Sequence, residues 1–95
     1  MIAVIAVMTV KDGSGAEFEA VVAELAAQVR ANEEGTPLFQ LTRSKADPNI
    51  YKFMELYRDG DAIKAHASTE YFTAAFKAMA PLLVGEPQIE YLDAL

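Results

Sequence analysis

The chain contains no cysteine and only one histidine, His66. Disulfide bonds and thiolate metal sites are therefore excluded, and one histidine cannot supply the ligands of a common zinc or two-histidine iron site within one chain. Basic residues are also scarce, because eight Lys and Arg stand against 14 Asp and Glu, giving a formal net charge of −6. Nucleic acids and anionic membranes both attract basic surfaces, so we expect neither as a partner.

Motifs for nucleotide and nucleophile chemistry are missing as well. The sequence has no GxGxxG or P-loop glycine pattern and no GxSxG nucleophile elbow. Its first apolar run, MIAVIAVMTV, is too short to span a bilayer and lacks the basic start of a signal peptide. We therefore expect a cytoplasmic protein, and any enzyme chemistry is expected to need no metal, nucleotide or other cofactor.

The residues that are present suit one domain over 1–95, and 53% of them are hydrophobic. That share is high, since a chain of this size buries only about two-thirds of its unfolded surface. The first apolar run, Ile2 to Val10, is apolar on both of its alternating faces, which indicates a strand covered on both sides. A second copy of the chain is the natural cover for the second face, so we expect a homodimer.

The remaining patterns predict a βαββαβ order. After the first strand, a helix is expected to start at a Ser14–Glu17 capping box and to end near Asn32, and strands are expected over 38–44 and 50–57. A short helix capped by Asp61 follows. The next helix starts at Ser68 or Thr69 and ends near Ala80 because of Pro81, and a last strand covers 88–92. With right-handed crossovers this is an α+β, ferredoxin-like fold, in which a four-stranded antiparallel sheet carries helices on one face. Two such sheets would close into a dimeric α/β barrel.

The third strand carries the most informative side chains. Tyr51, Phe53, Glu55 and Tyr57 share one of its faces. If that face packs against the helices, Glu55 becomes a half-buried acid that needs a partner. His66 follows within about ten residues and should lie over the same sheet. We therefore expect a hydrogen bond between Glu55 and His66 that fixes the tautomer of the imidazole and raises its basicity.

Two aromatic residues of the next helix, Phe72 and Phe76, would supply apolar walls for a flat ligand. Simpler interpretations stay open at this point. Phe72, Phe76 and Met79 recur at helical spacing, which is typical of residues that only fill a core.

Plain structural roles are also open for the polar candidates. A single histidine near a helix start is more often exposed to solvent or simply hydrogen-bonded than catalytic. Glu55 has an alternative cross-strand partner in Arg43. The segment Asn32-Glu33-Glu34 is expected to be a solvated loop.

Three segments of the chain are similar to one family. They are VKDGSGAEFEAVVAELAA after the first strand, EEGTPLFQLTRSKADPNIYKFMELYRDGDAIKAHASTEYF in the middle, and APLL before the last strand. The middle segment is the most specific, because a glutamate in the third strand is followed by Tyr-Arg-Asp and then by His66, Ser68 and Phe72. On these residues the chain resembles the antibiotic biosynthesis monooxygenase (ABM) family, which consists of small dimeric ferredoxin-like proteins and includes quinol monooxygenases.

The resemblance implies a cofactor-independent monooxygenase that uses O₂ on a small quinol-like or polyphenolic aromatic substrate. By analogy, His66 would be the base and Glu55 would orient it. Both match family positions, whereas hydrogen-bond donation by Tyr51 or Tyr57 is inferred from strand geometry. The substrate-binding residues expected on this basis are Tyr51, Phe53, Tyr57, Phe72 and Phe76.

The family also includes haem-degrading members, which use a first-strand asparagine, a tryptophan and a haem-ligating histidine. This chain has no tryptophan and no asparagine in the first strand, while His66 and Phe76 fall where the tryptophan and the ligand would be. Haem degradation is therefore not expected. A ligand-binding dimer without catalytic activity and an isomerase of small hydroxyketones remain as alternatives, because fold alone does not settle function.

Overall fold

The computed structural model describes all 95 residues. Its elements are β1 (Ile2–Thr9), α1 (Gly15–Asn32), β2 (Leu38–Arg43), β3 (Ile50–Tyr57), α2 (Gly60–Ala67), α3 (Glu70–Met79), a 3₁₀ turn (Ala80–Leu82) and β4 (Gln88–Asp93). The four predicted strands are confirmed, with shifts of at most one residue at their ends.

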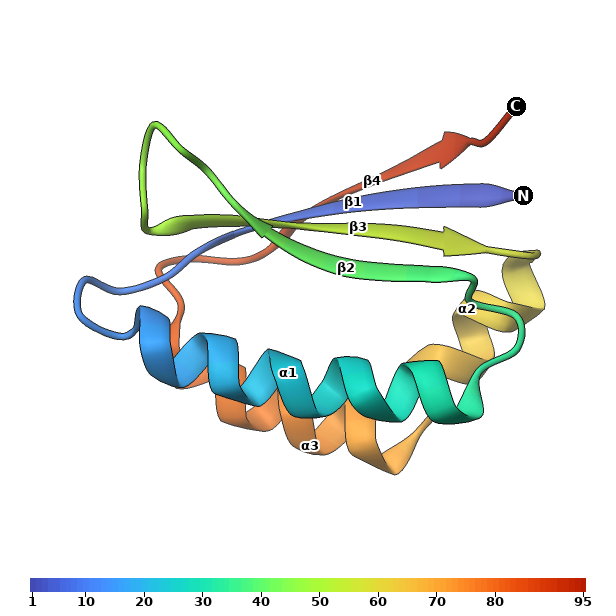
Figure 1. The fold of residues 1–95 in the computed structure, drawn as a ribbon, viewed down its shortest axis with the longest axis horizontal. Coiled ribbons are helices and arrows are strands. Elements are labelled where there is room, and N and C mark those ends of the chain that lie inside the picture. The colour runs from blue at the N-terminus through green and yellow to red at the C-terminus, as the bar shows by residue number, and fades with distance from the viewer.

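The four strands form one antiparallel sheet in the order β2-β3-β1-β4. Figure 1 shows α1 and α3 side by side beneath one face of this sheet and α2 near the end where the chain termini lie, while the other face carries no helix. This arrangement confirms the predicted α+β ferredoxin-like fold. It also gives the sheet an inner face toward the helices and an outer face away from them.

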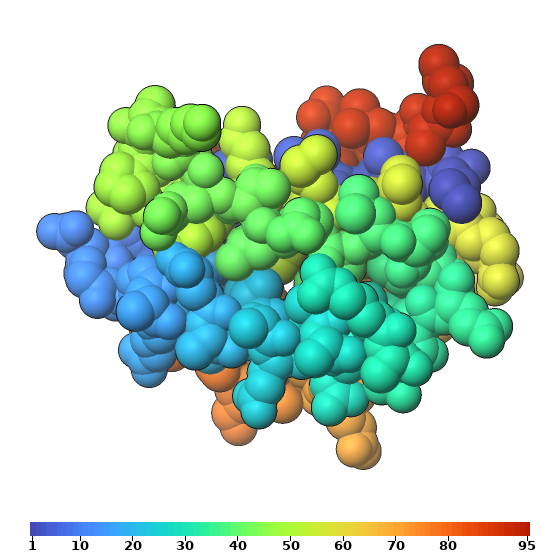
Figure 2. All heavy atoms as spheres, in the orientation of Figure 1, coloured from blue at the N-terminus to red at the C-terminus, as the bar shows by residue number.

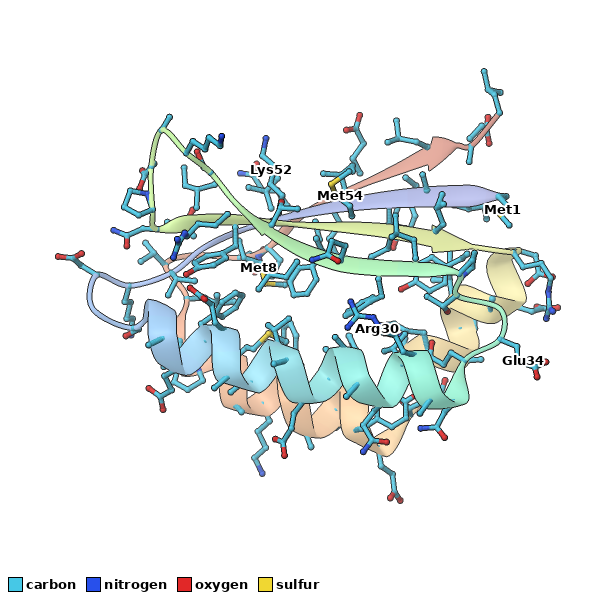
Figure 3. All side chains as sticks on the ribbon, viewed as in Figure 1. Met1, Met8, Arg30, Glu34, Lys52 and Met54 are labelled. Atoms are coloured by element: carbon cyan, nitrogen blue, oxygen red, sulfur yellow. The ribbon has the colours of Figure 1, made fainter.

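The inner face packs against one stripe of α1. Phe18, Val22, Leu25 and Val29 recur at the spacing of one helix face, and all four are buried. On the sheet, alternate residues of β1 point toward this stripe, and Met8 lies between the two layers in Figure 3. The helices and the sheet are therefore held together mainly by apolar burial. No helix combines the length and hydropathy that a membrane span requires.

The outer face of the sheet is largely apolar and uncovered. Lys52 and Met54 project from it in Figure 3, on the side opposite Met8. Met54 is 44% exposed, although it pairs with Ile5 at the centre of the sheet. The other apolar residues of this face, by strand register, are Ala3, Val7, Leu38, Leu56 and Leu92.

Two predicted helix caps are wrong. Ser14 precedes α1, but its side chain makes no capping hydrogen bond, because its backbone (φ −101°, ψ 4°) lies outside the extended region usual for an N-cap. The second helix begins two residues earlier than expected. Its cap is consequently Asp59, whose carboxylate accepts from the Ala62 N–H at 2.9 Å, and Asp61 lies in the first turn.

The third helix behaves as predicted. Thr69 caps it by accepting a hydrogen bond from the Phe72 N–H at 3.2 Å. Its α-helical part ends at Met79, and Pro81 lies in the 3₁₀ turn that follows. This cap fixes the start of the helix that supplies Phe72 and Phe76.

Candidate active site

A cavity of about 220 Å³ lies between the inner face of the sheet and the helices. Fourteen of the 17 residues that line it are hydrophobic, so it is suited to an apolar ligand. The exceptions are Glu55, His66 and Pro87. Acid–base chemistry in this cavity therefore depends on one imidazole, one carboxyl group and the phenols of Tyr57 and Tyr91.

His66 forms part of the wall of this cavity and is only 5% exposed, which excludes the solvent-facing interpretation. Three aromatic rings surround its imidazole. The ring centroids of Phe72, Phe39 and Tyr57 lie 4.8, 5.3 and 5.6 Å from that of His66. The imidazole is thus held in an aromatic, largely water-excluded environment.

The hydrogen-bond partner of His66 is Glu33, and the expected bond to Glu55 is absent. His66 Nδ1 lies 2.9 Å from Oε1 and 3.1 Å from Oε2 of Glu33. An ionised carboxylate can only accept, so in the neutral imidazole Nδ1 carries the proton and Nε2 has a free lone pair. Nε2 has no hydrogen-bond partner in the protein. Every fully buried side-chain nitrogen or oxygen does have such a partner, so Nε2 is not fully buried. Nε2 therefore keeps some accessible surface, on a residue that lines the cavity.

Glu33 itself was expected in a solvated loop, and this expectation is wrong. Its side chain is 9% exposed, and its carboxylate accepts hydrogen bonds from Tyr71 Oη and, at 3.1 Å, from Thr36 Oγ1. Burial, together with the hydrogen bond to Glu33, raises the pKa of Tyr71 to about 12. Three donors thus compensate the carboxylate and hold it against the imidazole.

One glycine allows the loop of Glu33 to approach α2 closely. A Cβ at Gly35 would lie 2.9 Å from the Cβ of Ala62, which is shorter than real Cβ contacts. The Gly35 carbonyl also accepts from the Arg58 N–H at 2.8 Å. The loop after α1 is therefore fixed against the helix that carries His66. A sequence signal for Glu33 did exist, since an acid at a helix C-terminus opposes the helix dipole unless it is paired.

Glu55 belongs to a separate pair with Tyr57. The Tyr57 hydroxyl donates to the Glu55 carboxyl, and no ion pair involves Glu55. The alternative partner, Arg43, instead pairs with Glu19 at 3.2 Å. Burial raises the pKa of Glu55, although the hydrogen bond from Tyr57 opposes this effect. Burial and the neighbouring Glu55 also raise the pKa of Tyr57.

The aromatic candidates divide between the cavity and the core. Phe53, Tyr57, Phe72 and Phe76 line the cavity. Tyr51 does not, because it lies toward the other end of β3, where its hydroxyl donates to Glu19 Oε2 at 2.5 Å. Met79, considered above as a core residue, is 1% exposed and also forms part of the cavity wall.

The cavity opens between α3 and β4. Phe76, Ile89 and Tyr91 all line it and are 39%, 54% and 62% exposed. On the face shown in Figure 2, by contrast, side chains of α1 meet those of β2. Sequence reasoning missed the two β4 residues, because only the register shows that they share the inner face with Val4 and Ala6.

Fold and cavity together define a class: a small ferredoxin-like protein with an apolar pocket between its sheet and its helices, lined by one histidine and one glutamate. Residues 1–78 match the family model described as antibiotic biosynthesis monooxygenase. This match spans most of the chain, and the chain therefore belongs to the antibiotic biosynthesis monooxygenase family. The predicted resemblance is confirmed.

Solved structures agree with this assignment. A Caulobacter crescentus protein assigned to the antibiotic biosynthesis monooxygenases is 51% identical, with 99% of this chain and 89% of that one covered and a TM-score of 0.96. A Pseudomonas aeruginosa protein is 26% identical, with 99% and 93% covered and a TM-score of 0.88. A Nitrosomonas europaea protein at 19% identity, with 99% and 89% covered, shares the fold with a TM-score of 0.95. No curated protein matches the sequence. These findings support a monooxygenase at the level of the family.

Proposed function

We propose that this protein is a cofactor-independent monooxygenase that uses O₂ to oxidise a small quinol-like or polyphenolic aromatic compound. One observation carries the proposal: His66 is buried in the wall of an apolar cavity, Glu33 holds its Nδ1, and its Nε2 has no partner in the protein. This is the geometry of a general base with an orienting carboxylate.

The chemistry requires little beyond that base. His66 Nε2 accepts the proton of one substrate hydroxyl, and the resulting anion is electron-rich enough to transfer an electron to O₂. A hydroquinone and O₂ then give a hydroxyquinone and water, so the substrate itself supplies all the electrons. The protein needs to provide the base, a fixed orientation and a cavity that excludes water.

The size of the cavity supports a small aromatic substrate. A protein cavity of about 150 Å³ accommodates benzene, and the cavity here is about 220 Å³. One ring with substituents, or two fused rings, therefore fits without rearrangement of the walls. The rings of Phe72 and Phe76, with centroids 6.2 Å apart, supply a flat side to this space.

We further propose that two copies pair through their outer sheet faces. Leu38, Met54 and Leu92 are 37%, 44% and 39% exposed there, on a face that no helix covers. A second copy of the same face would remove this apolar surface from water. The expected result is a dimer by sedimentation, and Met54→Lys should shift it toward the monomer.

Oxygen uptake with a panel of hydroquinones tests the proposed reaction. His66→Ala should lower the rate about 10²- to 10⁴-fold, which is the usual contribution of a general base. Lys64→Ala changes an exposed residue of the same helix and serves as the control, with no effect expected. Unchanged uptake in His66→Ala would contradict the proposed role of His66. Ligand binding without uptake in the wild type would favour the non-catalytic dimer, and conversion of hydroxyketones without uptake would favour the isomerase.

Glu33→Gln tests the orienting role separately. The amide is neutral and can either accept from Nδ1–H or donate to Nδ1, so the tautomer with its proton on Nε2, which blocks proton acceptance, becomes populated. We expect kcat to fall strongly while KM changes little, because ligand contacts are retained. A variant with wild-type kcat would show that Glu33 is only a structural partner of His66.

A further inference from the structure

Glu55 remains without a function once Glu33 is recognised as the partner of His66. It lines the cavity, and its cross-strand neighbours are Val4 on β1 and Phe39 on β2. The Tyr57 hydroxyl is its one side-chain hydrogen-bond partner. Glu55 is thus a carboxyl group in apolar surroundings with one donor beside it.

No cation compensates this carboxyl group. Arg43 pairs with Glu19, Arg58 pairs with Asp59, and Arg30 donates to the Phe39 carbonyl at 3.0 Å. Ionisation of a half-buried carboxyl group without a cation is costly, so these surroundings disfavour the charged form of Glu55. Burial accordingly raises the pKa of Glu55 above its ordinary range.

Ionisable groups on four elements act on the Glu55–Tyr57 pair. Burial and the charge of Glu33 after α1 oppose the ionised form of Glu55, whereas Tyr57 on β3 and the protonated form of His66 on α2 favour it. Tyr91 on β4 acts on Tyr57. His66 and Glu55 line the same cavity, where His66 offers a nitrogen lone pair and Glu55 offers a carboxyl oxygen.

We propose that Glu55 acts as a neutral carboxylic acid that donates a hydrogen bond to a second oxygen of the ligand. Tyr57 holds one carboxyl oxygen, and the other carries the proton toward the cavity. The site then selects flat ligands with a hydroxyl group for His66 and an oxygen acceptor for Glu55. This inference rests on the proposed function, because it assumes an aromatic ligand whose hydroxyl group meets His66.

A neutral donor at this position also suits the reaction. As the substrate loses electrons, its second oxygen acquires carbonyl character and becomes a better acceptor. A hydrogen bond that strengthens in this way stabilises the transition state more than the ground state. Glu55 is therefore a specificity-determining residue that contacts the ligand, in place of the orienting role expected from the sequence.

The test compares the binding of isosteric phenols by calorimetry, without turnover. The probes are 4-methoxyphenol against 4-ethylphenol and the corresponding 3-substituted pair, which differ only by an oxygen in place of a methylene group. The wild type should bind the methoxy compound of at least one pair about 3- to 10-fold more tightly, as expected for one hydrogen bond. This preference should disappear as pH rises through the pKa of Glu55, because the ionised carboxylate has no proton to donate.

Two variants separate the possible roles of the carboxyl group. Glu55→Gln keeps a donor and should retain the preference without its pH dependence, whereas Glu55→Leu should lose it. Equal affinities in the wild type for both pairs, or a preference for the ethyl compounds, would overturn the proposal. So would loss of the preference in a folded Glu55→Gln variant. Since these affinities are measured without O₂ uptake, inactivity toward hydroquinones would contradict the proposed function and leave this result unchanged.

Discussion

Each end of β3 carries a buried tyrosine that donates to a glutamate, but the two glutamates lie in different surroundings. At one end, the hydroxyl of Tyr51 donates to Glu19, whose carboxylate also binds Arg43 at 3.2 Å. At the other end, the hydroxyl of Tyr57 donates to Glu55, which has no cation. Both tyrosines are almost fully buried, at 2% and 1% exposed. The arginine beside the acid, and not the burial of the phenol, distinguishes the two ends.

Packing differs in the same way. Beside Tyr51, the ring of Phe18 lies 4.8 Å away, is fully buried and leaves no space for a ligand. Beside Tyr57, the neighbouring ring is the imidazole of His66, and the space in front of it is the cavity. An acid that is paired with arginine at the surface has a structural role. An acid without a cation at an apolar cavity is a candidate for chemistry.

The largest expected effect contrasts one phenylalanine from each end. Phe18→Ala should lower the free energy of unfolding by about 3–5 kcal/mol, because it creates a void in a filled core. Phe72→Ala should cost less than about 2 kcal/mol, since Phe72 is only partly buried and already borders the cavity. Urea unfolding of both variants measures the difference, and equal losses would show that the two ends are packed alike.

Ligand affinity should change in the opposite order. Phe72→Ala removes a wall of the cavity and should weaken the binding of 4-methoxyphenol, whereas a folded Phe18→Ala variant should bind it normally. If Phe18→Ala weakened binding more than Phe72→Ala, the division into a structural and a functional end would be wrong.

The fold could be predicted from the sequence because its signals are local. Alternation in β3 placed Tyr51, Phe53, Glu55 and Tyr57 on one face, and Pro81 marked the end of α3 correctly. The βαββαβ order, together with right-handed crossovers, then indicated the ferredoxin-like topology. The same local reasoning missed the cap of α2 by two residues, and it placed Ser14 correctly before α1 but could not show that its backbone prevents the capping hydrogen bond.

The candidate site was predicted only in part, because its decisive contact joins residues far apart in the chain. Strand alternation placed Glu55 in the cavity wall, and its distance along the chain from His66 suggested a bond. The imidazole turns instead to Glu33, 33 positions earlier, whose place depends on the close approach of Gly35 to α2. No periodic pattern in the sequence indicates that this loop lies close to α2. The functions of these side chains remain proposals.

A smaller effect comes from removing each tyrosine hydroxyl in turn. Tyr51→Phe should lower the free energy of unfolding by about 0.5–1.5 kcal/mol, as for one hydrogen bond, and leave ligand binding unchanged. In Tyr57→Phe, Glu55 loses the hydrogen bond that lowers its pKa. The preference for 4-methoxyphenol should therefore persist to higher pH than in the wild type. Calorimetric titrations across pH test this shift, and a shift in the opposite direction would contradict the role of Tyr57.

The smallest expected effect concerns Tyr71, whose acid partner Glu33 is bound by His66 and by no lysine or arginine. Its pKa of about 12 lies above the ordinary value of 10.0, so the folded protein retains a proton that the unfolded chain releases. The resulting stabilisation is complete below about pH 10 and is lost as pH rises toward about 12. Tyr71→Phe should show a shallower loss of stability across this window, and the effect is small because Tyr71 is partly exposed. In Glu33→Gln, phenolate absorbance should report a lower pKa for Tyr71, since the carboxylate that raises it is gone. An unchanged value would mean that burial alone, and not the carboxylate beside His66, sets the pKa of this phenol.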